Sequence, residues 1–167
     1  MSTKHNKQKG FSLIELLIVV AIILIIAAIA IPNLLRSKMA ANESSASGSV
    51  RSIVTAQVTY SATYGVGYAP DIPTLGTPTV PCVAVQTAAC LLDPVLTTGT
   101  KSGYTIGTST TNAAAEFVAT AVPVALNQTG NRSFCGDETL TVKFNPAVVS
   151  VAADDVACQA FPNQLGQ

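Results

Sequence analysis

The fold of this chain is decided by the stretch Phe11–Ile31, FSLIELLIVVAIILIIAAIAI, which is followed directly by Pro32. Only Ser12 and Glu15 interrupt its apolar side chains. A helix of this length rises about 30 Å, which is the thickness of one bilayer core. The stretch therefore predicts a helix that spans a membrane once.

The segment ahead of this stretch is basic, with Lys4, Lys7 and Lys9 in the first ten residues and no lysine inside the apolar run. Positive charge on one side of a membrane helix marks the cytoplasmic side. We therefore expect the N-terminus in the cytoplasm and everything after Pro32 on the outer side of the membrane.

Glu15 is the one ionisable side chain within the apolar stretch. An acid near a membrane core costs roughly 2.5 to 3.5 kcal/mol on insertion scales and usually has a partner. One candidate partner is the free amino group of another copy of the chain that has been cut close to Glu15. The alternative is that Glu15 reaches the cytoplasmic headgroups, because it lies only one turn into the span.

The run Lys9-Gly10-Phe11-Ser12-Leu13-Ile14-Glu15, with Pro32 closing the apolar helix, resembles the prepilin signal of type IV pilins and type II secretion pseudopilins. The resemblance covers about the first forty residues. It implies cleavage by prepilin peptidase between Gly10 and Phe11, N-methylation of Phe11, and use of the helix as a polymerisation core. In this family the acid that matches Glu15 pairs with the new amino terminus of a neighbouring subunit.

The resemblance also implies where the protein acts and with what partners. The precursor would sit in the inner membrane, and the pilus assembly machinery would build a homo-oligomeric helical filament on the cell surface. One departure is that the run Leu13–Ile31 contains no glycine, whereas many pilins carry one before the proline. How far the helix unwinds at Pro32 in a filament stays open.

A different cleavage site competes with the one after Gly10. Ala28-Ile29-Ala30 has the small-x-small form of a conventional secretory signal, and cutting there would release a soluble protein that starts at Ile31. Glu15, the length of the apolar run and the helical pattern beyond Pro32 argue against that site.

Composition excludes several classes of function. The chain is 49% hydrophobic and only 11% charged, and of its nine Lys and Arg six remain beside nine acids once residues 1–10 are removed, which argues against specific nucleic-acid binding. The single histidine, His5, lies in the leader, so we expect no catalytic residue, no metal site and no cofactor. The acid pairs Asp137-Glu138 and Asp154-Asp155 fit solvated turns better than calcium ligands, because no EF-hand spacing is present.

The residues after Pro32 predict a second helical half and then a β-sheet head. Apolar side chains at Ala46, Val50, Ile53, Val54, Val58 and Tyr64 form one stripe, with Gln57 as a mismatch. Alternating apolar residues then predict four strands, marked by Tyr104 and Ile106, by Phe117, Ala119 and Ala121, by Leu140, Val142 and Phe144, and by Val149 and Val151. Short connections between them favour an antiparallel meander packed on the helix, an α+β fold.

The expected organisation has five segments. They are a leader (1–10), a transmembrane and polymerisation helix (11–31), an amphipathic helix entering the head (32–64), a connecting loop rich in Pro, Thr and Gly (65–103), and the β-sheet head (104–167).

Four cysteines follow the membrane segment, at positions 82, 90, 135 and 158, without a CxxC motif. An even number in a translocated domain indicates two disulfides, although the sequence alone leaves all three pairings open. We expect Cys82 to pair with Cys90, which would clip a short subloop. The pilin resemblance implies that Cys135 and Cys158 close the C-terminal region.

Three functions are compatible with a domain on such an anchor. The first is a structural subunit of a type IV pilus, a surface filament for adhesion, motility or DNA uptake. The second is a pseudopilin of a type II secretion system, and the third is an enzyme or binding domain on a membrane anchor. The first is preferred, because the four cysteines and the lack of a clear calcium loop argue against the second and the missing histidine against the third.

Overall fold

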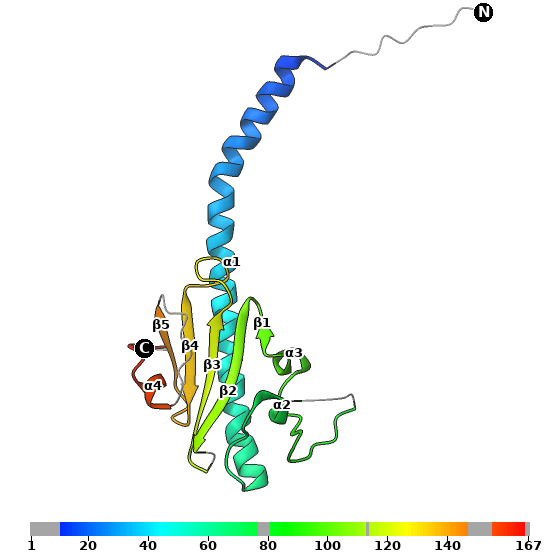
Figure 1. The fold of residues 1–167 in the computed structure, drawn as a ribbon. Helices are drawn as coiled ribbons and strands as arrows, with labels where there is room; N and C mark the ends of the chain where they lie inside the picture. The colour runs from blue at the N-terminus through cyan, green and yellow to red at the C-terminus, as the bar shows by residue number, and fades with distance from the viewer. Residues whose placement is uncertain (1–10, 77–80, 113, 147–154, 166–167) are drawn as a thin grey trace, which may run out of the picture. The chain divides into compact units, whose positions relative to one another are not determined.

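The computed structural model describes residues 11–76, 81–112, 114–146 and 155–165. It has two compact units, Met1–Ser37 and Lys38–Gln167, and helix α1 (Leu13–Tyr64) belongs to both. All other described elements lie in the second unit, which is called the head below (Figure 1).

The head contains an antiparallel sheet in which the strands follow one another in chain order, from β1 to β6. Three short helices are described with it: α2 (Ile72–Leu75) and α3 (Pro94–Thr97) precede all of its strands in the sequence, and α4 (Asp155–Gln159) lies between β5 and β6. The strands are β1 (Thr100–Lys101), β2 (Tyr104–Asn112), β3 (Glu116–Pro123), β4 (Arg132–Asp137), β5 (Val142–Pro146) and β6 (Asn163–Gln164).

The predicted α+β fold, a long apolar N-terminal helix followed by an antiparallel sheet against the helix, is confirmed. The described part of the chain has six strands rather than four. The prediction missed the two-residue edge strands β1 and β6 and the central strand β4, while the strand expected at Val149 and Val151 lies outside the described residues.

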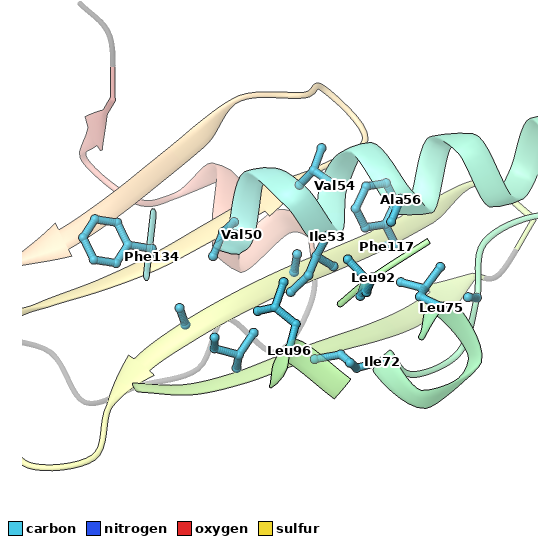
Figure 2. Packing of buried hydrophobic residues seen from close by; sticks show 14 of the residues in the cluster. Val50, Ile53, Val54, Ala56, Ile72, Leu75, Leu92, Leu96, Phe117 and Phe134 are labelled. Atoms are coloured by element: carbon cyan, nitrogen blue, oxygen red, sulfur yellow. The ribbon is translucent and has the colours of Figure 1, made fainter. Parts of the chain in front are cut away.

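The core lies between the second half of α1 and one face of the sheet. Val50, Ile53 and Val54 of α1 are buried with Phe117 of β3 and Phe134 of β4, as Figure 2 shows. Burying a side chain of this size contributes about 1.5 to 3 kcal/mol. The strand positions predicted to face inward on β2 and β3, from Tyr104 to Ala121, all belong to this cluster.

The buried stripe of α1 differs from its prediction at Val58, which is 37% exposed. Gln57, the polar residue within the predicted stripe, is fully buried. Gln57 is accommodated because its amide bonds the main chain of Ala69, just after the helix ends. Tyr60 belongs to the core, and Tyr64 and Tyr68 pack against it.

The opposite face of the sheet carries a second, smaller cluster. Val118 of β3 and Cys135 of β4 are buried there against Cys158 of α4. Strand β4 is therefore covered on both faces, and its lack of apolar alternation follows from that double burial. Helix α4 thus covers this second face of the sheet.

Candidate assembly site

The apolar half of α1 is the first part of the candidate site. Leucine, isoleucine, valine and alanine make up most of it, and its side chains are exposed or half-exposed in the structure. Phe11, two residues before the helix begins, is 83% exposed. By length and composition α1 is the one helix among the described residues that could cross a membrane. A helix that is apolar all round needs lipid or other helices as its surroundings.

Glu15 has a hydrogen-bond partner within its own chain. The main-chain N–H of Ser12 donates to Glu15 Oε2 at 3.0 Å, and the carbonyl of Ser12 accepts from Leu16 N–H at 3.2 Å. Ser12 therefore lies at the N-cap position and Glu15 at the third helical position, in the S-x-x-E pattern of a capping box. The signal for this contact is present in the sequence as Ser12-Leu13-Ile14-Glu15, but the sequence-based interpretation missed it.

Pro32 lies inside α1 and does not end it. Because proline has no N–H, the carbonyl of Ala28 receives no helical hydrogen bond from residue 32. The missing bond is a local weak point in a helix that otherwise continues on both sides. Gly10, the residue expected before the cleavage site, lies outside the described residues, so the structure places Phe11 and not its predecessor.

The four cysteines lie in the head and form two disulfides, Cys82 with Cys90 and Cys135 with Cys158. This is the expected pairing. Cys135 and Cys158 are both fully buried and join β4 to α4, so this bridge fastens the cover to the sheet. Cys82 and Cys90 join the two ends of a half-exposed loop, which contains a bridge between Val85 and Ala88.

The β3–β4 loop is held to α1 by polar contacts. Asn42 Nδ2 donates to the Thr129 carbonyl at 2.9 Å, and Asn131 N–H donates to Glu43 Oε1 at 2.8 Å. Arg132 Nε lies 3.5 Å from Glu43 Oε2, and its guanidinium carbon lies 4.9 Å from the centre of the Phe144 ring. These contacts fix the β3–β4 connection on the helix within the head.

Tyr104 is buried beside this cluster and donates its hydroxyl to the Arg132 carbonyl at 3.0 Å. Burial, with a smaller contribution from the negative charge of Glu43, raises the pKa of Tyr104 to about 12. The side chain is thus neutral at any physiological pH and acts as a packing and hydrogen-bonding group.

The expectation that the acid pairs lie in solvated turns is wrong for Asp137. Asp137 is fully buried at the end of β4, and its Oδ1 accepts hydrogen bonds from the N–H and hydroxyl of Thr139. It therefore closes the β4–β5 turn, in which Leu140 has a positive φ of 64° and is not part of a strand. Asp154 lies outside the described residues.

Comparison with known proteins first identifies the class of the N-terminal segment. Residues 5–31 match the family model described as the prokaryotic N-terminal methylation motif. This match covers the residues from the basic leader to the end of the apolar run, including Glu15. The resemblance inferred from those residues is thereby confirmed.

Two particular relatives are pilins. The type IV major pilin protein PilA of Myxococcus xanthus is 43% identical over 60 residues, which is 36% of this chain and 27% of that protein. The type IV wide pilus major component PilA4 of Thermus thermophilus is 60% identical over 38 residues, or 23% and 29% of the two chains. The chain thus matches less than a third of the length of either relative. No solved structure matches it.

Proposed function

We propose that this chain is a structural subunit of a type IV pilus, which polymerises through its N-terminal helix into a surface filament. The observation that carries the proposal is the combination of an exposed apolar helix with one acid, Glu15, inside a matched methylation motif. The similarity to a protein named as a type IV major pilin and to another named as a major component of a type IV wide pilus supports it.

The proposed pathway begins with a precursor in the inner membrane. Prepilin peptidase cuts between Gly10 and Phe11, the new amino terminus is methylated, and the pilus assembly machinery moves the subunit from lipid into a bundle of like helices. In that bundle the Phe11 amino group of one subunit meets Glu15 of its neighbour. Opposite charges attract more strongly there than in water, because the surroundings have a low dielectric constant.

Pro32 is proposed to serve assembly as well. The missing hydrogen bond at Ala28 makes this turn the least costly place for the helix to unwind or bend when helices pack in the filament. The segments 11–31, 32–64, 65–103 and 104–167 would then act as polymerisation helix, head helix, connecting loop and sheet-containing surface domain. The filament would serve adhesion, motility or DNA uptake.

The test is the amount of filament per subunit. Surface filaments are sheared from cells and compared with total processed subunit in the membrane, for wild type and for Glu15→Ala. We expect the variant to insert and to be cut after Gly10 but to lose most of its filaments. An unchanged ratio would contradict the assembly role of Glu15.

Two further observations separate this function from its alternatives. Intact-mass measurement of the wild-type chain should give a mature protein that starts at methylated Phe11; a start at Ile31 would contradict the proposal. Electron micrographs of cells that lack the gene should show no long filaments. Loss of protein secretion with long filaments intact would indicate the pseudopilin function instead.

A further inference from the structure

The hydrogen bond at the N-terminus of α1 holds the Glu15 side chain within a single chain. Ser12 N–H and Glu15 Oε2 are 3.0 Å apart, and the helix begins at Leu13. Within the residues that the structure describes, this is the contact that the Glu15 carboxylate makes, and it uses one of the two oxygens. The other oxygen, Oε1, has no partner among those residues.

This contact matters more in a membrane than in water. The first N–H groups of a helix have no partner within the helix, and in lipid no water is present to satisfy them. A carboxylate at the third position satisfies one such N–H and also lies at the positive end of the helix dipole. The bond therefore removes an unsatisfied donor and partly compensates a buried charge at the same time.

Because the cap uses only one carboxylate oxygen of Glu15, the other oxygen can bind a second group. A carboxylate has acceptor sites on both oxygens, so one oxygen can hold the Ser12 N–H while the other accepts from an ammonium group. A glutamate fixed by its own helix also loses no further rotamer freedom when the second partner arrives.

We propose that Ser12 is a positioning residue for assembly: its main-chain N–H fixes the Glu15 side chain in the lipid-embedded subunit, with Oε1 presented to the Phe11 amino group of a second copy. The inference rests on the proposed function. It adds that Glu15 is bound within its own chain before docking, and that a main-chain group rather than the Ser12 hydroxyl does the positioning.

Three variants separate these contributions. Ser12→Pro removes the N–H that binds Glu15, whereas the matched control Ser12→Ala removes the hydroxyl and keeps the N–H. Glu15→Gln keeps an acceptor for the cap, since glutamine also occupies this capping-box position, but carries no charge. Filament yield is measured per processed subunit, so a defect in cleavage does not enter the ratio.

We expect Ser12→Ala to assemble like wild type and Ser12→Pro to lower the ratio by roughly two- to tenfold, the cost of ordering one long side chain at docking. Glu15→Gln should fall further, because it loses the charge itself. Equal ratios for Ser12→Pro and Ser12→Ala would overturn the positioning role of Ser12. Normal filaments in Glu15→Gln and Glu15→Ala would instead overturn the role of Glu15 in the proposed function.

A second measurement is independent of assembly. Amide hydrogen exchange at Ser12 is followed by NMR in bicelle-embedded mature subunit. Exchange should be at least about tenfold faster in Glu15→Ala than in wild type, as for loss of a hydrogen bond to a charged acceptor, and should stay slow in Glu15→Gln. The same exchange rate in wild type and Glu15→Ala would overturn the cap itself, whatever the filament yields are.

Discussion

The side-chain amide of Gln57 forms two hydrogen bonds with the main chain of Ala69, with Nε2 donating to the carbonyl and the N–H donating to Oε1, both at 2.8 Å. Both residues are fully buried. The pair fastens the chain that leaves α1 back onto the helix, and Nε2 also donates to Thr108 of β2 at 3.1 Å. One side chain thus joins the helix, the loop and the sheet.

Replacing Gln57 with leucine should destabilise the head by roughly 2 to 4 kcal/mol, because it leaves the buried N–H and carbonyl of Ala69 without partners. The matched control is Gln128→Leu at an exposed position of the β3–β4 loop, which should change stability by less than about 0.5 kcal/mol. Near-UV circular dichroism of the solubilised chain during heating follows the head, since all four tyrosines lie there. Equal midpoints for the two variants would contradict the prediction.

Two glycines should respond to alanine in opposite directions. A Cβ on Gly136 of β4 would lie 2.7 Å from Val54 Cγ2 and 3.1 Å from Val50 Cγ1, whereas a Cβ on Gly48 of α1 would meet nothing within 4 Å. Gly136→Ala should therefore cost about 1 to 3 kcal/mol through overpacking. Gly48→Ala should stabilise the helix by about 0.5 to 1 kcal/mol, and thermal unfolding of both variants checks the two signs. A stable Gly136→Ala variant would mean that α1 and β4 lie farther apart than described.

Alkaline pH should unfold the head in a way that depends on Tyr104. Its pKa is about 12 in the folded chain and about 10 in an unfolded one, so the folded state favours the protonated form. The resulting stability is fully present below pH 10 and is lost as the pH rises toward 12, by at most about 3 kcal/mol. Unfolding midpoints from pH 9 to 12 should fall less steeply for Tyr104→Phe than for wild type. Parallel curves would show that other groups cause the loss.

The two disulfides should differ in their importance. The chain-entropy model assigns about 3 kcal/mol to each loop, with the larger share for Cys135–Cys158 because its sequence separation is 23 rather than 8. The Cys135→Ser, Cys158→Ser double variant also places hydroxyls in a fully buried site, so it should lose more stability than Cys82→Ser, Cys90→Ser. Urea unfolding of the two double variants tests the order. Nonreducing peptide mapping of the wild type should recover both native pairs, and a crossed pair would contradict the structure.

The sequence could predict which residues are buried wherever a helix or strand buries only one of its faces. The inward residues of β2 and β3 and the stripe of α1 from Ala46 to Val54 follow from spacing alone, because one face of each element is buried. Strand β4 could not be found in this way, since Phe134 faces α1 while Cys135 faces α4 and both are buried. Strand β4 is covered by α1 on one face and by α4 on the other, and these two helices are far apart in the sequence.

The candidate site and the polar contacts of the head differ in the same way. The apolar run, Glu15 and Pro32 are visible in the sequence because a membrane helix is a local pattern. The hydrogen-bond partners of the buried Gln57 could not be predicted, because Ala69 and Thr108 lie 12 and 51 residues away. The contact between Ser12 and Glu15 is local, and knowledge of helix capping would have been enough to predict it.

The order of the strands sets the order in which the head can form as the chain is made. Each strand pairs with the strand that precedes it in the sequence. The sheet can therefore form hairpin by hairpin, without contacts between strands that are far apart in the sequence. The stripe of α1 from Ala46 to Tyr60 is made earlier than all of these strands and stays uncovered until they arrive. Cys158 is the last of the four cysteines, and its disulfide joins α4 to β4. A chain that ends before that residue would hold strands β1 to β5 but neither β6 nor the bridge to α4. The oxidation of Cys158 therefore marks the point at which β4 becomes covered on both faces.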